Sequence, residues 1–287
     1  MEKKRGNYLS LSERGGNLPH TLQNDYLFKV VMEADEKILR SLLCSLLGVG
    51  KDEIVSVMIT NPIIPGSKAD EKTTMLDIKI LLNNRKIINL EMQNIDRHDW
   101  QERSLIYLCR CFNNIKKGAD YIDVIPAQHI GILDFALSHL SEEFYSHFYM
   151  MNPKTHEIYS DKLCISVLNL KYIEMATEED KRQGLDKWAA AFLAKTWEEF
   201  QMLAAENSVY ESVADAIYEA LAEDNIREAC LRYEEQKAVE ERFIRERDDA
   251  LKIIQEKEIT IQEKEITIQE KDKRIAEPEK ALAEAGR

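Results

Sequence analysis

The chain lacks several features that would assign it to a well-marked class of protein. Its five cysteines are odd in number and include no Cys-x-x-Cys pair, so we expect reduced thiols and no cysteine zinc site. The six histidines form no His-Glu-x-x-His arrangement. Long apolar runs are also missing, since charges such as Arg40 interrupt them, and the first residues hold no apolar signal core. We therefore expect no membrane span and a cytoplasmic location.

Positive charge is scarce. The 287 residues include 39 basic and 52 acidic side chains, which gives a formal net charge of −13. A protein that binds duplex DNA is usually basic, because neutralising phosphates drives its affinity. If this chain binds DNA, the binding must be weak and strongly salt-dependent, through a local basic face. The candidates for that face are Arg97, Arg103, Arg110, Lys116 and Lys117.

Enough hydrophobic residues are present for a substantial core, at 44% of the chain. We expect a flexible N-terminus over residues 1–17 and one folded domain over residues 18–233. A charged helical tail is expected over residues 234–287. The pattern turns helical from Glu178 onward, where the aromatic residues expected in the core are Trp188, Phe192, Trp197 and Phe200.

The most informative segment is residues 76–93, which read LDIKILLNNRKIINLEMQ. Two apolar stretches flank a polar turn, as in a β-hairpin. Side chains alternate between the two faces of a strand, so Glu91 and Gln93 share one face and Leu90 and Met92 take the other. Asp77 lies on the first strand, within reach of the same face.

The length of the hairpin loop decides whether the two carboxylates meet. A three-residue loop over residues 83–85 pairs Leu82 with Lys86 and places Asp77 opposite Glu91. A two-residue loop shifts the register by one and sends the carboxylates to opposite faces. Asparagine in the loop tolerates the positive φ that such turns need.

Two carboxylates on adjacent strands can share a hard divalent cation, which prefers oxygen ligands. A cation held in this way polarises a phosphodiester and activates water, so the segment is typical of metal-dependent nucleic-acid cleavage. The alternative is an ordinary amphipathic hairpin on which Asp77 and Glu91 are solvent-facing charges.

Two helices are expected around this hairpin. Apolar residues recur at helical spacing from Asp25 to Leu47, with Asp25 at the N-cap position and Gly48 as a stop signal. A second helix is expected from about His98 to Lys117. Arg103, Tyr107 and Arg110 fall on one of its faces, where they would contact phosphate, or where the tyrosine would pack in the core beside surface arginines.

Several segments in order give the chain a resemblance to a known family. It resembles the PD-(D/E)xK nucleases, and more narrowly the PD-(D/E)xK family of transposases and recombination-promoting nucleases. The resemblance is carried by NDYLFKVVM (residues 24–32), LDIKI (76–80), NLEMQ (89–93), ERSLIYLCRCF (102–112), KKGADYIDVIPAQHIGILDFAL (116–137) and GLDKWAAAFL (184–193).

The resemblance implies an α/β, restriction-endonuclease-like core with a mixed sheet flanked by helices. A helical region and a long charged C-terminal helix would follow this core. Asp77 and Glu91 would ligate the metal, together with the Met92 carbonyl. Gln93 stands where many members of the wider fold have lysine, and it would orient a water without carrying charge.

Four further positions match family elements beside such a site. A D-x-x-F-K element gives Asp25 and Lys29, which would approach the metal or a phosphate. Asp25 could instead cap its helix, and Lys29 could be a solvated surface charge. Glu91, Met92 and Gln93 form an E-x-Q motif on the second strand of the hairpin. Arg103 and Tyr107 fit the element that follows this E-x-Q strand in related nucleases.

The implied function is a DNA endonuclease that uses Mg²⁺, or another divalent cation such as Mn²⁺ or Ca²⁺, and promotes recombination or mobile-element activity. The alternative is a catalytically degenerate nuclease fold that acts as a DNA-binding or coiled-coil assembly module. Loss of metal-dependent nicking in an Asp77→Ala variant would separate the two.

The tail repeats with a period of seven residues. QEKEITI occurs at residues 255–261 and again at 262–268, followed by QEKDKRI at 269–275. This period favours a long helix or a coiled coil that joins copies of the chain. The apolar seam is incomplete, however, because acids at 258, 265 and 272 occupy one of its two positions, so a lone charged helix is an equal alternative. Pro278 is expected to end or kink the helix.

Overall fold

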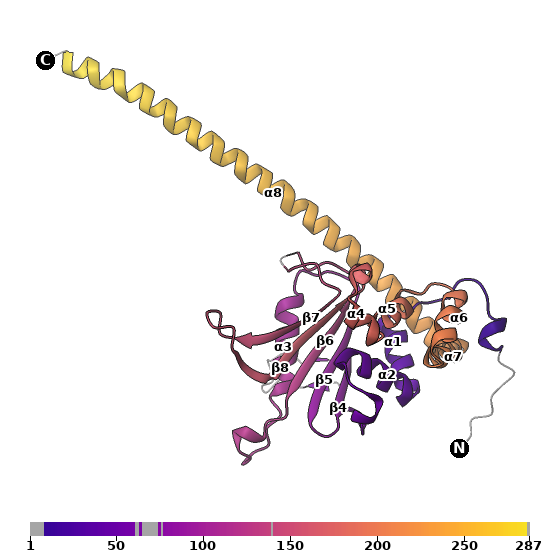
Figure 1. Ribbon diagram of the computed structural model, residues 1–287. Coiled ribbons are helices and arrows are strands. Elements are labelled where there is room, and N and C mark those ends of the chain that lie inside the picture. The colour runs from indigo at the N-terminus through magenta and orange to yellow at the C-terminus, as the bar shows by residue number, and fades with distance from the viewer. Residues whose placement is uncertain (1–8, 61–62, 65–73, 76, 139, 286–287) are drawn as a thin grey trace. The chain divides into compact units, whose positions relative to one another are not determined.

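The computed structural model describes residues 9–60, 63–64, 74–75, 77–138 and 140–285. They separate into two compact units, residues 1–235 and residues 236–287. None of the helices in these ranges is long and apolar enough to cross a membrane. Figure 1 labels the α-helices and the strands β4 to β8.

The first unit is built on a mixed six-stranded sheet with the order β1-β4-β5-β6-β8-β7. β4 runs antiparallel to β1 and β5, β6 runs parallel to β5 and β8, and β7 is antiparallel to β8. A separate two-stranded sheet pairs β2 with β3. The strands are β1 (Val57–Thr60), β2 (Ile63–Ile64), β3 (Thr74–Met75), β4 (Ile78–Leu82), β5 (Lys86–Gln93), β6 (Ala127–Leu133), β7 (Tyr145–Met151) and β8 (Ile158–Asn169).

Helices cover both faces of the sheet, so the expected α/β architecture is confirmed. α3 packs on one face against β5, β6 and β8, and the helices on the other face form the main core. The helices are α1 (Asp25–Ala34), α2 (Glu36–Leu47), α3 (Trp100–Phe112), α4 (Glu178–Arg182), α5 (Leu185–Leu193), α6 (Trp197–Glu206), α7 (Val209–Ala222) and α8 (Asp224–Ala285), with 3₁₀ turns η1 (Leu11–Glu13), η2 (Lys51–Glu53), η3 (Tyr121–Asp123) and η4 (Leu170–Met175).

The alternation of side chains along the strands divides the core into two layers. Ile78, Ile80, Ile88, Leu90 and Met92 point to the face that carries the main core. The residues between them point toward α3. The four aromatic residues expected in the helical region, Trp188, Phe192, Trp197 and Phe200, are all buried in the main core, as predicted.

The helix expected from Asp25 to Leu47 is two helices. Asp35 is extended (φ −143°, ψ 122°), and its side chain accepts a hydrogen bond from the Lys37 backbone N–H at 2.8 Å, which caps α2. The stop at Gly48 is confirmed, because this residue is left-handed (φ 63°). The break escaped prediction because the apolar spacing continues across it.

The second helix is shorter than expected, since α3 begins at Trp100 and ends at Phe112. Asn114 explains the early end. Its side chain donates to the carbonyls of Cys111 and Ile125 and accepts from the Ile125 N–H, which turns the chain toward β6.

Residues 9–17 pack against the helical region. Leu11 is buried, and the guanidinium carbon of Arg14 lies 4.2 Å from the centroid of the Tyr218 ring. Arg14 also donates to Asp215 at 2.7 Å. Residues 1–8 lie outside the described residues.

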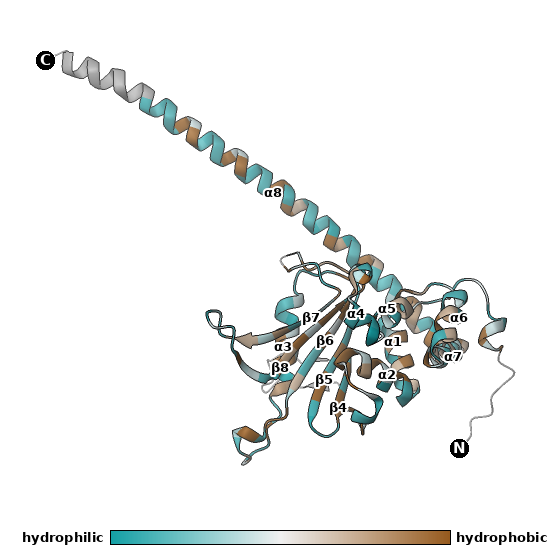
Figure 2. Ribbon diagram, in the orientation of Figure 1, coloured by the Kyte–Doolittle hydropathy of each residue, from teal (hydrophilic) through white to brown (hydrophobic). Residues whose placement is uncertain are grey.

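α8 starts in the first unit and supplies all of the second. Most of its described residues are hydrophilic, with isolated hydrophobic residues between them (Figure 2). Of the two outcomes expected at Pro278, an end or a kink, the end is wrong, because α8 continues to Ala285. A proline removes one backbone hydrogen bond from a helix.

Candidate active site

The β4–β5 hairpin has the register that brings the two acids together. Leu82 pairs with Lys86, so the loop has three residues, as predicted. Asn83 and Asn84 both have positive φ, of 50° and 53°. The Asn83 side chain also accepts from the Val55 and Ser56 backbone N–H groups, at 2.7 and 3.0 Å, which fixes the turn to the rest of the sheet.

Asp77 immediately precedes β4 and lies opposite Glu91 when this register is continued by one residue. Its Oδ2 accepts a hydrogen bond from the Met92 backbone N–H at 3.1 Å. The Met92 side chain points to the main core and is 3% exposed, as the alternation predicts. The two carboxylates therefore belong to one side of the hairpin.

α1 adds a second acid and a lysine to Asp77. Lys29 Nζ lies 3.2 Å from Asp77 Oδ1 and 3.1 Å from Asp25 Oδ2. The alternative that Asp25 caps α1 is wrong, because the N-cap is Asn24, whose side chain accepts from the Leu27 N–H. Asp25 is the first helical residue, and its Oδ1 is buried without a hydrogen-bond partner.

α3 brings a guanidinium to Glu91. Arg103 Nη2 forms an ion pair with Glu91 Oε1, although the two groups are not aligned as a hydrogen bond. Arg103 Nε donates to the Tyr107 hydroxyl at 3.2 Å, and the guanidinium carbon lies 5.3 Å from the Tyr107 ring centroid. Arg110 follows Tyr107 by one turn and is half-buried. The helix face predicted from spacing thus lies beside the E-x-Q strand.

Burial makes both central carboxylates weak acids. The pKa of Glu91 is raised to about 8 by burial and then by the Asp77 charge, while Arg103 opposes the shift. The pKa of Asp77 is raised to about 7 by burial and then by Asp25, while Lys29 opposes the shift. The site therefore holds more acid than its two cations neutralise, which favours a further positive charge.

His129 on β6 is a neighbour that spacing did not single out. Its Nδ1 accepts from the Asn89 amide at 2.8 Å, so Nε2 carries the hydrogen and faces Glu91 Oε2 at 3.8 Å. Burial, and then the Arg103 charge, lower the pKa of His129 to about 3, so the ring is neutral. The only sequence signal is its position in the buried strand beside the E-x-Q strand.

Trp100 packs over His129, with ring centroids 5.3 Å apart. This packing requires a glycine at position 131, because a Cβ there would lie 2.2 Å from the indole. Trp100 was predicted only as part of a helix, and its role as the cover of this face comes from the tertiary structure.

Gln93 lies two residues beyond Glu91 on the same face and is 6% exposed. Its amide nitrogen donates to the Ile95 carbonyl at 3.0 Å, while its Oε1 is buried without a hydrogen-bond partner. The group that remains available is therefore a hydrogen-bond acceptor.

Tyr233 enters the site from the first turns of α8. Its hydroxyl lies close to the Asn94 side chain and the Asp25 backbone. Burial, followed by the Asp25 charge, raises the pKa of Tyr233 to about 12. No sequence pattern indicates this contact, because Tyr233 is more than 130 residues from Glu91 along the chain.

The donor set fits a hard cation. In the described parts of the chain no three His, Cys, Asp or Glu residues form a ready metal cluster. Asp77 and Glu91 nevertheless supply two carboxylates, and both oxygens of Glu91 lack hydrogen bonds. The N–H and C=O of a strand residue point to the same side, so the Met92 carbonyl points toward Asp77 as its N–H does. Two carboxylates, a carbonyl and retained waters are the ligands that Mg²⁺ accepts.

Comparison with known families gives a match over most of the chain. The model of a family described as PD-(D/E)XK nuclease family transposase matches residues 22–247, which include every residue of the site described above. Searches of curated proteins and of solved structures found no match.

Proposed function

Because the chain belongs to the PD-(D/E)XK nuclease family of transposases, we propose that it is a divalent-metal-dependent DNA endonuclease. The observation that carries the proposal is Glu91. Its buried oxygens make no hydrogen bond and are balanced only by the Arg103 ion pair, which is costly to fold, and it lies across the hairpin from a second acid. A site that only stabilised the fold would have no use for this pair.

Asp77, Glu91 and the Met92 carbonyl would hold Mg²⁺, with Mn²⁺ or Ca²⁺ as alternatives. A bound ion of this kind lowers the pKa of water and polarises the phosphodiester. The three protein ligands fix where a scissile phosphate can sit. Since Asp77 accepts from the Met92 N–H, the carboxylate and the carbonyl are held in one orientation.

Gln93 would orient the attacking water. Its amide nitrogen is committed to the Ile95 carbonyl, so its Oε1 can only accept a hydrogen from water. Its amide does not titrate at neutral pH, so it positions the water and takes no proton from it.

Four side chains would bind the DNA backbone near the site. Arg103 and Lys29 contact Glu91 and Asp77 here, and both can turn to phosphate oxygens once those acids hold a cation. Tyr107 and Arg110 continue the same face of α3. Since residues 1–233 carry 36 acidic and 27 basic side chains, affinity must come from this local surface and fall steeply with salt.

The biological setting we propose is DNA recombination or element mobility in the cytoplasm. The tail would bring copies of the chain together through its exposed isoleucines, which include Ile254, Ile261 and Ile268. The alternative proposal keeps the tail as the functional part, with the nuclease fold retained as a binding module.

Nicking of supercoiled plasmid at low salt tests the proposal. Wild-type protein should nick only when Mg²⁺ or Mn²⁺ is added, and Asp77→Asn and Glu91→Gln should fall to the metal-free background. Asp77→Asn retains an oxygen for the Met92 N–H, so the hairpin should stay folded. Glu102→Gln on the exposed start of α3 is the matched control and should nick like wild type. Folded wild-type protein that never nicks would refute the endonuclease and favour the binding module.

A further inference from the structure

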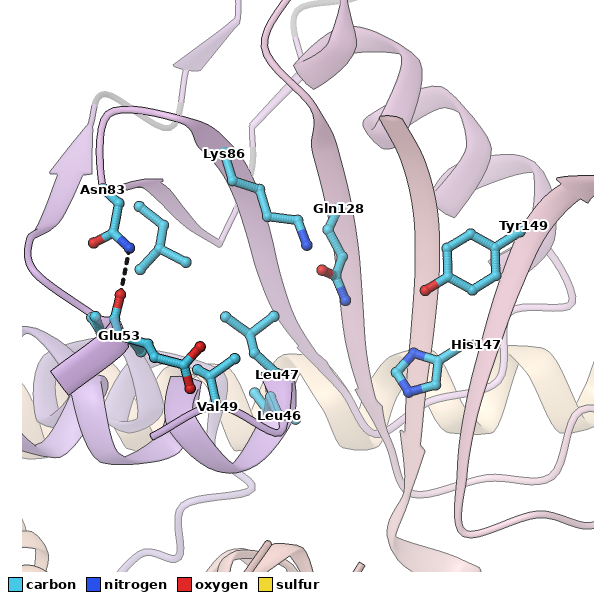
Figure 3. Close-up of a pocket in the computed structure, with 11 residues that line it drawn as sticks. Leu46, Leu47, Val49, Glu53, Asn83, Lys86, Gln128, His147 and Tyr149 are labelled. Atoms are coloured by element: carbon cyan, nitrogen blue, oxygen red, sulfur yellow. Dashed lines mark hydrogen bonds between the residues drawn. The ribbon is translucent and has the colours of Figure 1, made fainter. Parts of the chain in front are cut away.

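A cavity of about 410 Å³ lies on the sheet face opposite Glu91. Residues of β4, β5, β6 and β7 and of the end of α2 line it, and Figure 3 shows Lys86, Gln128 and His147 around it. It is lined by Leu46, Leu47, Val49, Glu53, Ile54, Leu82, Asn83, Lys86, Gln128, His147 and Tyr149. Nothing in the proposed nuclease reaction uses these residues.

The strand pairings explain how the polar members meet. Gln128 on β6 lies beside Cys164 on β8, and Cys164 lies beside Tyr149 on β7. Ser166 and His147 form the next pair on the same face. One side of the cavity is therefore a continuous polar patch on β6, β8 and β7.

Lys86 is the cation of the cavity. It is half-buried and makes no hydrogen bond or ion pair with any residue of the described chain. Neither Glu53, which lines the cavity, nor Asp161 forms an ion pair with it. Glu53 Oε1 accepts the Gly50 backbone N–H at 2.8 Å, and Asp161 interacts with Lys86 only through its charge. A lysine in such surroundings is suited to an anion that comes from outside.

A hydrogen-bonded chain sets the direction of His147. The Gln128 amide donates to Ser166 Oγ at 2.8 Å, and Ser166 Oγ lies 2.8 Å from His147 Nδ1, to which its hydroxyl can donate in one of the two tautomers of the ring. In this tautomer His147 Nε2 carries a hydrogen. Burial, and then the Lys86 charge, lower the pKa of His147, so the ring stays neutral and acts as a donor. The cavity thus offers an ammonium and an N–H.

The opposite wall is mainly apolar, and its one acid is Glu53. Leu46 and Leu47 end α2, whose last carbonyls would be unfavourable if they were unpaired. They are paired, because the Tyr145 hydroxyl donates to the Leu46 carbonyl and the Gly48 N–H donates to the last turn. Val49 and Leu82 complete this apolar side.

We propose that this cavity binds a small organic anion, with its carboxylate or phosphate on Lys86 and His147 and its apolar body against Leu46, Leu47 and Val49. The volume lies in the range of small-molecule sites. The proposal does not rest on nuclease activity, since the cavity and the candidate active site lie on opposite faces of the sheet.

Saturation-transfer NMR on the full chain, freed of metal by a chelating resin, tests the proposal. The probes are hexanoate, inorganic phosphate and neutral hexanol. Hexanoate should bind and hexanol should not. Binding of phosphate would show that an oxyanion binds the cavity without an apolar body. Lys86→Met should weaken hexanoate at least about 10-fold, the order expected for one charge-assisted hydrogen bond. His147→Phe should weaken it as well.

Two controls separate this site from the rest of the protein. Lys154→Met removes an exposed lysine from the β7–β8 turn and should leave binding unchanged, as should Asp77→Asn. Equal binding of hexanol and hexanoate would overturn the oxyanion assignment. Absence of hexanoate and phosphate binding by folded wild type, or full binding by Lys86→Met, would overturn the site.

Discussion

At the scale of single residues, Glu91 is held in surroundings that suit its neutral form. It is fully buried, and its neighbours are an acid, a neutral histidine and one guanidinium. Ionisation of Glu91 in these surroundings therefore lowers the free energy of unfolding, at a cost to the stability of the fold. The cost depends on pH, and it can be measured without any assay of cleavage.

The metal-free protein should lose stability as pH rises from about 4 to about 8. The pKa of an unfolded carboxyl is about 4, whereas those of Asp77 and Glu91 are raised to about 7 and about 8. Between these values the folded state holds more protons than the unfolded state, so the free energy of unfolding decreases with rising pH. Glu91→Gln should flatten this decrease in urea titrations run across the same pH range.

The Glu102→Gln variant is the control for that titration, since its side chain is exposed and its slope should match wild type. Mn²⁺ added at pH 8 should raise the midpoint of wild type and not that of Glu91→Gln. Parallel pH profiles for wild type and Glu91→Gln would show that Glu91 ionises as easily in the folded chain as in water.

Gly131 should be intolerant of a methyl group. A Cβ at this position would meet the Trp100 indole at 2.2 Å, so Gly131→Ala must displace the ring that covers His129. We expect a loss of about 1–3 kcal/mol in the free energy of unfolding, as for other overpacked cores. Gly50→Ala is the control, because its Cβ would have only an ordinary 3.5 Å contact. Equal urea midpoints for the two variants would mean that Trp100 moves aside at no cost.

At the scale of elements, the hairpin is the part on which the site depends. Its two strands carry the core on one side and the acids on the other, and the loop length links these two roles. A one-residue slip of β4 against β5 would exchange the faces.

Deleting Arg85 should therefore abolish metal-dependent nicking. The shortened loop would force either a slip that separates Asp77 from Glu91 or a loss of pairing along β4. Asn84→Gly keeps the loop length and suits the positive φ at this position, so it should nick like wild type. Plasmid nicking and far-UV circular dichroism report both effects. Wild-type nicking by the deletion variant would show that the loop does not set the register.

At the scale of the whole molecule, the boundary at Glu235 divides α8 into a part that belongs to the first unit and a part that forms the second. The first turns of α8 bury Ile226 and Cys230, and they supply Tyr233 to the candidate site. Beyond the boundary the described side chains are mostly exposed, and Leu251 and the repeat isoleucines are about half exposed.

A chain that stops after Glu235 should keep the melting temperature and the nicking of the full protein. A chain that stops after Ala222 should melt at a lower temperature, because it loses the buried turns of α8. Sedimentation of the full protein beside the chain that stops after Glu235 would show whether residues 236–287 join copies of the protein. Loss of nicking in the 1–235 chain, with its fold intact, would assign the tail a direct part in cleavage.

The sequence predicts those features that repeat along the chain. Alternation places Leu90 and Met92 in the core, and it brings Asp77 to the side of Glu91 once the loop length is chosen. Family resemblance adds Arg103 and Tyr107 beside them. These features could be predicted because each depends on residues close together in the sequence.

The missed features depend on distant partners. Asn24 takes the N-cap position expected of Asp25, and its amide also donates to the Cys230 carbonyl at 3.0 Å. His129 matters because β6 lies parallel to β5, and Tyr233 matters because α8 returns to α1. No local pattern encodes such contacts, since they form only when the elements pack.

The return of α8 to the start of α1 gives the protein a built-in delay during synthesis. His20 Nδ1 lies 2.7 Å from Glu234 Oε1, and Asn24 donates to the same carboxylate at 3.2 Å. A ribosome adds about 5–20 residues per second, so the stretch from Glu91 to Glu234 takes about 7–30 s to make. Throughout that interval the nascent chain carries both central acids without the helix that supports Asp25. Cutting activity would then arrive only after Glu234 has been made, which would keep shorter nascent chains from damaging the DNA around them.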